Sequence, residues 1–300
     1  MNVLLCGDWS ADERNEWQQA LSAAMPEARW FDGAAARAAP ASVHAAVVAN
    51  PPPGTLQGLP ALRLIQSLWA GVDRLLADNT LPAGVPVARM VDPAMNAAMA
   101  ETALWAVLSL HRGFFTYAQR QRQREWRVHA QRRADEVRVL VLGQGQMGRA
   151  AAARIAQQGY TLSTWRRDGS ALPPLLAQAD IVVNLLPLTD DTRGLLDAEF
   201  FASLPPDASV VNLARGAHVV DADLLAALDS GHLRHAVLDV FHVEPLPADH
   251  PYWLHPRVTL LPHAAAGTDA RSAAVVAVAN LRACRDGGHI QHLVERRRGY

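Results

Sequence analysis

Lysine is absent from this 300-residue sequence, and its 28 basic residues other than histidine are all arginines. Schiff-base catalysis and a Walker-type phosphate loop both require a lysine, so both are excluded. Cysteine is scarce as well, because Cys6 and Cys284 are too few for a disulfide framework or a cysteine-ligated metal site. We therefore expect a cytoplasmic protein in a reducing compartment, and we expect no metal centre.

Long hydrophobic runs and an excess of either charge are also missing. No apolar run approaches the roughly 18–20 residues that cross a membrane, and no basic residue precedes the short apolar run at residues 3–6, which argues against a signal peptide. The 28 basic residues nearly balance 29 acidic ones, whereas nucleic acids and anionic membranes attract a large positive excess. We expect neither a nucleic acid nor a membrane as a partner.

Hydrophobic residues make up half of the sequence and occur in short runs separated by helical patterns. At roughly 100–200 residues per domain, the length suggests two domains. Short buried runs of this kind predict α/β architecture, with parallel sheets covered by helices on both faces. Strands are expected at residues 3–6, 42–49, 63–68 and 85–90, and then at 137–142, 161–165, 181–186, 209–213, 236–240 and 258–261.

The longest helical pattern covers residues 93–120. Its leading part, residues 94–110, is apolar nearly all round, which predicts burial between domains. The polar stretch 119–133 that follows contains six arginines. A nucleic-acid patch is one interpretation of this stretch, but the balanced net charge favours a solvated arm or a subunit contact.

A glycine-rich turn follows the strand expected at residues 137–142. Its first glycine permits a tight turn, the second lets the backbone approach a pyrophosphate, and the third allows a helix to pack closely on the strand. The positive end of that helix also favours an anion. We therefore expect a dinucleotide cofactor rather than a purely structural turn. The residues that fit the pattern G-x-G-x-x-G are Gly143, Gln144, Gly145, Gln146, Met147 and Gly148.

The end of the next expected strand discriminates between the two nicotinamide cofactors. An NAD site usually carries an acidic residue about 20 residues after the glycines, which accepts hydrogen bonds from the ribose. Trp165, Arg166 and Arg167 stand at this place instead, and the first carboxylate is Asp168. Because two arginines can bind a 2′-phosphate by charge-assisted hydrogen bonds, we expect NADP(H), with NAD(H) as the alternative.

Three polar residues, Arg215, Glu244 and His263, follow later expected strands. Ligands of open α/β sheets bind beyond the carboxyl ends of the strands, so all three are placed to meet the nicotinamide end of the cofactor. An arginine can bind a carboxylate bidentately, a histidine can donate a proton near neutral pH, and a neighbouring carboxylate orients the imidazole ring. Each residue alone is a weak signal, but the ordered set predicts catalysis.

These segments resemble the D-isomer-specific 2-hydroxyacid dehydrogenase family over essentially the whole chain. The resemblance is carried by the glycine loop at 143–148, Asn-Leu-Ala-Arg-Gly at 212–216, Asp-Val-Phe at 239–241, Glu-Pro-Leu at 244–246 and Pro-His at 262–263. Within the family, the chain is most similar to the glyoxylate/hydroxypyruvate reductase A group. That narrower match is carried by Trp-Ala-Gly-Val-Asp at 69–73, Asn-Leu-Leu-Pro at 184–187, the run 221–231 and Arg-Gly-Tyr at 298–300.

The resemblance implies two doubly wound domains with the active site in a cleft between them. A flavodoxin-like substrate domain would comprise residues 1–90 and 270–300, and a Rossmann NAD(P)-binding domain would comprise residues 91–269. The resemblance further implies that Arg215 binds the carboxylate and carbonyl of a 2-oxo acid, that His263 is the general acid and that Glu244 is its partner. The other implied contacts are Trp69, Ala70 and Gly71 to the substrate, and Leu186, Pro187, Ala214 and Asp239 to the cofactor.

The implied activity is the NADPH-dependent reduction of small 2-oxo acids, glyoxylate and hydroxypyruvate, to 2-hydroxy acids. A homodimer is expected because the family usually forms dimers. Two alternatives remain open, an NAD(H)-dependent dehydrogenase of a larger D-2-hydroxy acid and a non-catalytic cofactor-sensing protein. The set of Arg215, Glu244 and His263 disfavours the sensor, because a sensor needs none of them.

Overall fold

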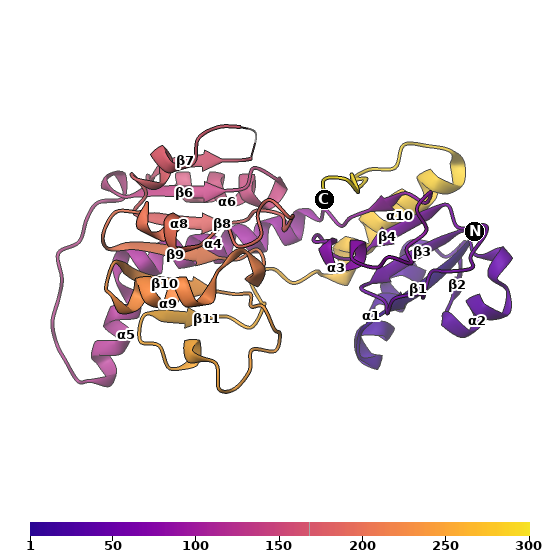
Figure 1. Cartoon of the computed structure of the whole chain (residues 1–300). Coiled ribbons are helices and arrows are strands. Elements are labelled where there is room, and N and C mark those ends of the chain that lie inside the picture. The colour runs from indigo at the N-terminus through magenta and orange to yellow at the C-terminus, as the bar shows by residue number, and fades with distance from the viewer. Residues whose placement is uncertain (168) are drawn as a thin grey trace. The chain divides into compact units, whose positions relative to one another are not determined.

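A computed structural model of the chain describes residues 1–167 and 169–300. Two compact units make up this structure, each a parallel β-sheet covered by helices (Figure 1). One unit comprises Met1–Met95 with Thr268–Tyr300, and the other comprises Asn96–Gly267. The predicted fold class, two doubly wound α/β units, is confirmed. The units divide a few residues away from the boundaries proposed at 90 and 270.

The first unit contains a five-stranded sheet in the order β2-β1-β3-β4-β5, with every pair parallel. Its strands are β1 (Asn2–Gly7), β2 (Arg29–Phe31), β3 (Ala45–Ala49), β4 (Leu64–Ser67) and β5 (Val87–Ala88). Its helices are α1 (Ala11–Ala24), α2 (Gly33–Ala38), η1 (Pro40–Ser42), α3 (Asp73–Leu76) and α10 (Ala270–Asp286). The short edge strand β2 was not predicted, because three residues with one exposed arginine give no clear period.

Helix α10, from the C-terminal part of the chain, packs beside α1 and against β4, and it appears in yellow among the indigo strands in Figure 1. A buried hydrogen bond fixes this packing, since Asn280 Nδ2 donates to Gln66 Oε1 on β4 at 2.8 Å. Both side chains are almost fully buried, so removal of either one would leave the other without its hydrogen-bond partner and destabilise the fold. The return of the chain to this unit makes it discontinuous in sequence.

The second unit contains a six-stranded parallel sheet in the order β11-β10-β9-β8-β6-β7. Its strands are β6 (Arg138–Leu142), β7 (Thr161–Trp165), β8 (Ile181–Asn184), β9 (Ala208–Asn212), β10 (Leu233–Leu238) and β11 (Val258–Leu260). Its helices are α4 (Pro93–Arg112, which begins in the first unit), α5 (Phe114–Arg122), η2 (Ala134–Glu136), α6 (Gln146–Ala156), α7 (Pro173–Leu176), α8 (Ala198–Ala202), η3 (Gly216–His218), α9 (Asp221–Asp229) and η4 (Pro251–Trp253).

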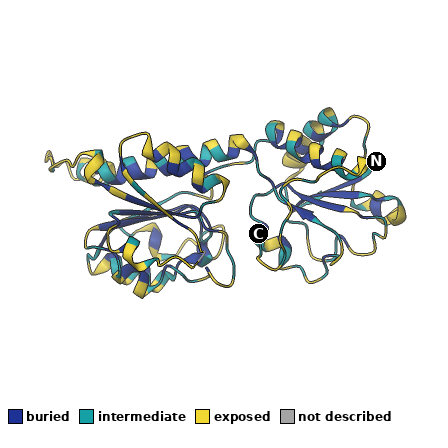
Figure 2. Ribbon diagram, turned by 90° about the horizontal axis from the view of Figure 1, so that it is seen from above, coloured by how far each residue is buried: buried dark blue, intermediate teal, exposed yellow. Residues whose placement is uncertain are grey.

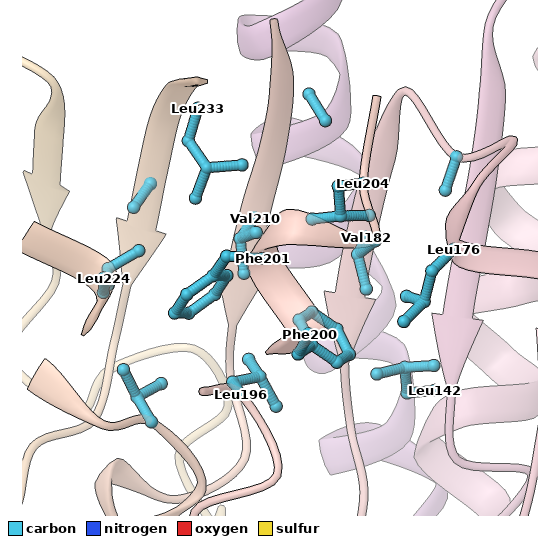
Figure 3. Close-up of a cluster of buried hydrophobic side chains, with 14 of the residues drawn as sticks. Leu142, Leu176, Val182, Leu196, Phe200, Phe201, Leu204, Val210, Leu224 and Leu233 are labelled. Atoms are coloured by element: carbon cyan, nitrogen blue, oxygen red, sulfur yellow. The ribbon is translucent and has the colours of Figure 1, made fainter. Parts of the chain in front are cut away.

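Both faces of this sheet are buried, and alternate residues of each strand face different cores. Leu140 and Leu142 of β6 pack with α7, α8 and α9, as Figure 3 shows for Leu142, Leu176, Phe200 and Leu224. Val139 and Val141 of the same strand pack with α4 and α6. The inner strands are accordingly mostly dark blue in Figure 2, whereas the edge strand β7 and the outer sides of the helices carry exposed residues. Burial on two faces explains why the strands read as continuous apolar runs.

The single helix predicted over residues 93–120 was wrong. Gly113, with a φ of 71°, ends α4 at Arg112 and is followed by α5. Ala97, Glu101 and Trp105 form an exposed stripe of α4 at four-residue spacing. Because Ala97 and Trp105 are apolar, the composition of α4 does not distinguish its exposed side from its buried side. The burial of residues 94–110 between domains stays a prediction.

None of the helices in the described part of the chain is long and apolar enough to cross a membrane.

Candidate active site

The carboxyl ends of β6, β8, β9, β10 and β11 lie at one edge of the second sheet, because all of these strands are parallel. The glycine loop follows β6, Arg215 follows β9, and Glu244 and His263 follow β10 and β11. This edge is where ligands bind in open α/β sheets. The fold therefore gathers residues that are up to 120 positions apart in the sequence (263 − 143 = 120).

The glycine loop has the geometry of a phosphate-binding turn. A Cβ on Gly143, whose φ is 106°, would lie 2.5 Å from the carbonyl oxygen of Leu185, and a Cβ on Gly148 would overlap the carbonyl oxygen of Gly143. By contrast, apart from its neighbours in the chain, no heavy atom of the described residues lies within 4 Å of a Cβ built on Gly145, which precedes α6. Two glycines thus serve packing, while the third leaves open space at a helix N-terminus, as a bound pyrophosphate requires.

Side chains of the loop also meet the neighbouring strand. Gln144 Nε2 donates to Thr164 Oγ1 at 3.0 Å, and the Gly143 N–H donates to the carbonyl oxygen of Trp165 at 2.8 Å. Gln146 and Met147 form the first turn of α6, where backbone N–H groups point away from the helix. These contacts hold the turn open in a defined shape.

The end of β7 carries Trp165, and Arg166 and Arg167 follow it. The Trp165 ring is buried in the core, and its Nε1 donates to the carbonyl oxygen of Ser170 at 3.0 Å. Arg167 is engaged with Asp191, through an ion pair at 3.4 Å and a bond to the Asp191 carbonyl oxygen at 2.7 Å. Arg166 is exposed, and Asp168 lies outside the described residues. Trp165, Arg166 and Arg167 all stay predicted cofactor ligands, with the two arginines assigned to a 2′-phosphate.

A chain of buried amides connects the loops after β8 and β9. Asn184 Oδ1 accepts from the Leu186 N–H at 3.2 Å, and Asn184 Nδ2 donates to Asn212 Oδ1 at 3.0 Å. Asn212 Nδ2 in turn donates to the carbonyl oxygen of Arg215 at 2.9 Å. Both asparagines are fully buried, so their amides hold the backbone of Leu186 and of Arg215 in a fixed relation.

Asn184 and Asn212 were not among the predicted site residues. Their signal was present, since each is a polar residue that closes an apolar strand at the ligand-binding edge. His218 was missed as well. Its Nδ1 lies 3.2 Å from the Arg215 carbonyl oxygen and its Nε2 lies 3.3 Å from that of Pro187, so this buried ring bridges the two loops.

Arg215 lies just beyond β9 and is half-buried, and its Nη1 donates to the carbonyl oxygen of Ala214 at 2.8 Å. Ala214 and Leu186 are buried, and Pro187 is exposed. A guanidinium group presents its N–H donors in a planar fork that matches the two oxygens of a carboxylate. Its position therefore fits the recognition of a small anionic acid.

Glu244 and His263 form a hydrogen-bonded pair. His263 Nδ1–H donates to Glu244 Oε2 at 2.7 Å, and Glu244 Oε1 accepts from the Phe241 N–H at 2.9 Å. The His263 side chain is 51% exposed and the Glu244 side chain is 35% exposed, so both reach solvent at the sheet edge. A carboxylate on Nδ1 fixes the tautomer and leaves Nε2 as the nitrogen that can exchange a proton with a ligand.

Asp239 supports this pair from beneath. Its buried carboxylate accepts hydrogen bonds from the Ala264 N–H at 2.7 Å and the Ala265 N–H at 3.1 Å. Its backbone carbonyl oxygen accepts a hydrogen bond from the His263 N–H at 2.8 Å. Burial raises the pKa of Asp239, and the two backbone bonds partly oppose this shift. Each oxygen keeps a second lone pair for the predicted nicotinamide contact. The visible function of Asp239 is to hold the turn that carries His263.

Trp69, Ala70 and Gly71 belong to the other unit, where they follow β4. Ser67 fixes the start of this loop, because its Oγ accepts from the Trp69 N–H at 3.0 Å and donates to the Trp69 carbonyl oxygen at 3.1 Å. The Met90 N–H also donates to that carbonyl oxygen at 3.0 Å. The loop therefore lies at the carboxyl edge of its own sheet, where the prediction placed a ligand.

Comparison with known proteins agrees with this geometry. The sequence profile of "D-isomer specific 2-hydroxyacid dehydrogenase, NAD binding domain" matches residues 104–265. The chain is 36% identical to glyoxylate/hydroxypyruvate reductase A of Yersinia enterocolitica, across 96% of this chain and 97% of that protein.

Two solved structures are similar over almost the whole chain. A D-isomer specific 2-hydroxyacid dehydrogenase from Xanthobacter autotrophicus, in complex with NADPH and MES, is 40% identical, with a TM-score of 0.92 and 99% of each chain covered. The NADPH-dependent glyoxylate/hydroxypyruvate reductase of Sinorhizobium meliloti, in complex with NADP and sulfate, is 32% identical, with a TM-score of 0.92 and 100% and 99% covered. The chain therefore belongs to the D-isomer specific 2-hydroxyacid dehydrogenase family and is an NAD(P)-dependent oxidoreductase.

Proposed function

We propose that the protein is an NADPH-dependent reductase of small 2-oxo acids, with glyoxylate and hydroxypyruvate as its substrates. The observation that carries the proposal is the Glu244–His263 pair, joined at 2.7 Å, at the same sheet edge as Arg215 and the glycine loop. A proton donor, an anion-binding cation and a pyrophosphate turn at one edge are what this reduction needs. Relatives that share nearly the full chain length carry the name glyoxylate/hydroxypyruvate reductase.

Cofactor binding is assigned to the unit Asn96–Gly267, which carries the glycine loop, and substrate recognition to the other unit. The choice of NADP(H) is supported by the arginines after β7 and by relatives whose structures contain NADPH or NADP. When bound, the cofactor supplies the hydride for C2 of the 2-oxo acid. Asp239, Leu186, Pro187 and Ala214 are assigned to the cofactor's nicotinamide end.

The residues of the chain account for the remaining steps. Arg215 binds the substrate carboxylate and polarises the adjacent carbonyl group. His263 donates the proton on Nε2 to the carbonyl oxygen as negative charge develops there, and Glu244 stabilises the imidazolium from Nδ1. The backbone of Trp69, Ala70 and Gly71 is assigned to the substrate carboxylate. The product is the D-2-hydroxy acid where it is chiral.

A homodimer in the cytoplasm is part of the proposal. Hydrophobic side chains stand exposed on the arm at residues 123–133, where Trp126 is fully exposed and Val128 is 81% exposed. Exposed apolar groups of this size favour a protein contact over solvent. Sedimentation equilibrium of the protein and of Trp126→Ser tests it, because the dimer would weaken in the variant.

The function is tested by absorbance at 340 nm with purified protein and glyoxylate, with NADPH and NADH side by side. Rapid oxidation of NADPH alone supports both the reductase and the cofactor assignment. Preference for NADH keeps the enzyme class and removes the argument from Arg166 and Arg167. No turnover with glyoxylate or hydroxypyruvate, despite cofactor binding, contradicts the proposal and favours a larger 2-oxo acid or a cofactor sensor.

A further inference from the structure

Two loops at the carboxyl edge of the second sheet carry the proposed chemistry, and their backbones touch. Residues 215–221 run from the arginine to the start of α9, and residues 241–253 contain Glu244. A Cβ built on Gly216 would overlap the backbone carbonyl group of Phe241, so no side chain fits between the loops. The position of Glu244 therefore depends on how firmly the two loops are joined.

The Asp221 side chain joins them at several points. Its Oδ1 accepts from the Tyr252 hydroxyl at 2.9 Å, and its carboxylate lies 3.8 Å from His242 Nε2 and 3.6 Å from His250 Nε2. His242 Nε2 also lies 2.8 Å from the carbonyl oxygen of Val219. One carboxylate thus meets three side chains of the loop 241–253.

Tyr252 anchors that loop in the core. Its ring is 2% exposed and packs with the core cluster of α8 and α9, 6.5 Å from the Phe241 ring and 4.5 Å from the His250 ring. A buried hydroxyl requires a hydrogen-bond partner, and Asp221 supplies it. Removal of the hydroxyl alone would leave the ring in place and remove its hydrogen bond to Asp221, the shortest contact between this carboxylate and the loop.

Glu244 uses both carboxylate oxygens: Oε1 accepts from the Phe241 N–H of this loop, and Oε2 accepts from His263 Nδ1, which lies beyond β11. Because the Glu244 and His263 side chains are 35% and 51% exposed, water competes for their bond. A hydrogen bond of this kind contributes only modestly to stability. The pair by itself therefore does not hold the loop in place.

We propose that Asp221 and Tyr252 are positioning residues that keep Glu244 aligned with His263 and tie this pair to the segment that carries Arg215. Both act through Glu244 and not on the reacting atoms. The kinetic consequence rests on the reductase function proposed above. The structural consequence needs no substrate, so the two proposals can fail separately.

The structural test compares Tyr252→Phe with Tyr160→Phe. Tyr160 is a matched control, because it is 6% exposed and its hydroxyl lies 2.8 Å from His111 Nδ1, in the core on the opposite face of the sheet. Amide hydrogen exchange at Phe241 reports the contact with Glu244. We expect exchange about tenfold faster in Tyr252→Phe and changed less than about twofold in Tyr160→Phe.

The kinetic test uses the same variants. In Tyr252→Phe, kcat should fall about tenfold, which is part of the factor of about 10²–10⁴ that a general acid contributes. The KM for glyoxylate and the Kd for NADPH should change less than about twofold, because Arg215 and the glycine loop are intact. Asp221→Ala should match Tyr252→Phe, and the double variant should be no slower than the slower single variant.

An unchanged Phe241 exchange rate in Tyr252→Phe would overturn the positioning role, even if the wild-type protein is an active reductase. A fall in kcat no larger than that of Tyr160→Phe would also overturn it. If Phe241 exchange responds while the wild-type protein reduces no 2-oxo acid, the positioning role stands and the proposed function fails. Asp221→Ala, at a side chain 32% exposed, replaces Tyr252→Phe if the latter does not fold.

Discussion

At the residue scale, His263 carries the largest expected effect on catalysis. His263→Ala removes the proposed proton donor, so kcat should fall by about 10²–10⁴-fold. NADPH affinity should persist, because the glycine loop and α6 are untouched. Steady-state rates at 340 nm and a fluorescence titration with NADPH measure the two effects, and His289→Ala, on the exposed surface, is the control. A variant that kept most of its kcat would remove His263 from the reaction.

His235 makes stability depend on pH. Burial lowers its pKa to about 4 from 6.5, helped by Arg234 and His255, and its ring stacks on Phe115 with centroids 4.7 Å apart. As the pH falls, His235 therefore takes up a proton in the unfolded chain at a higher pH than in the folded protein. Neutral His235 therefore makes its full contribution to the free energy of unfolding above pH 6.5, and this contribution is lost as the pH falls through about 4.

His235→Gln removes this titration but keeps a group that can bond Thr259, the partner of His235 Nε2 at 2.9 Å. Urea unfolding at a series of pH values should show the wild-type protein losing up to about 3 kcal/mol across this window, and the variant losing less. His289→Gln serves as the control. Parallel curves for wild type and His235→Gln would contradict the prediction.

The residues after β7 show the limit of prediction at this scale. The sequence placed Trp165, Arg166 and Arg167 at the end of the strand, where an adenosine 2′-phosphate would lie. It did not show that the Trp165 ring is buried or that Arg167 pairs with Asp191, 24 residues further on. Pairings of this kind depend on the path of another loop, which no local pattern contains.

At the scale of elements, different glycines of the loop before α6 are needed for packing and for cofactor binding. A Cβ on Gly148 would overlap the Gly143 carbonyl oxygen, whereas a Cβ on Gly145 faces space free of other described atoms within 4 Å. Gly148→Ala should therefore destabilise the fold by about 1–3 kcal/mol. Gly145→Ala should keep the wild-type Tm but bind NADPH at least about tenfold more weakly, since the pyrophosphate approaches there.

Calorimetry and NADPH titration of both variants measure this difference. Equal losses of Tm in Gly145→Ala and Gly148→Ala would show that both glycines serve packing alone.

The helix pattern at residues 93–120 was predicted as one element, and the structure divides it. Composition indicated helix throughout, but Gly113 adopts a left-handed conformation, and a Cβ there would overlap the His129 ring. His129 belongs to the arm that follows α5, so this requirement arises from a segment that folds back. The local pattern therefore did not predict the break between α4 and α5, although any glycine is a candidate for the end of a helix.

At the scale of the whole molecule, Glu27 links the two ends of the chain within the first unit. It accepts from Arg282 Nε at 2.9 Å and from Arg285 Nη1 at 3.3 Å, and Arg282 also donates to the carbonyl oxygen of Ala24. The hydrogen bond from Arg282, and less strongly Arg285, lowers the pKa of Glu27 to about 2 from 4.5. This stability is present above pH 4.5 and is lost as the pH falls towards 2.

Glu27→Gln should flatten the acid side of the stability curve and leave the neutral side nearly unchanged, because the pair is exposed and screened by solvent. Acid titration followed by circular dichroism, at low and high salt, measures the effect. Glu16→Gln, on the exposed side of α1, is the control. An acid transition as steep in Glu27→Gln as in the wild-type protein would contradict the role of this link.

Local pattern alone was enough for the α/β class, for most strands and for the residues that close them. It succeeded because parallel strands place their carboxyl ends at one edge, so a polar residue after an apolar run is already located there. The candidates Arg215, Glu244 and His263 could be identified on this basis and on the family resemblance.

Tertiary structure decided which of those residues meet. The 2.7 Å bond between Glu244 and His263, the amide bridge from Asn184 to Asn212 and the bond from Tyr252 to Asp221 all join different loops. Each depends on the strand order β8-β9-β10-β11 and on loop paths between these strands. Hydrophobic periodicity fixes the face on which a residue lies, but it carries no information about its neighbour on the next strand.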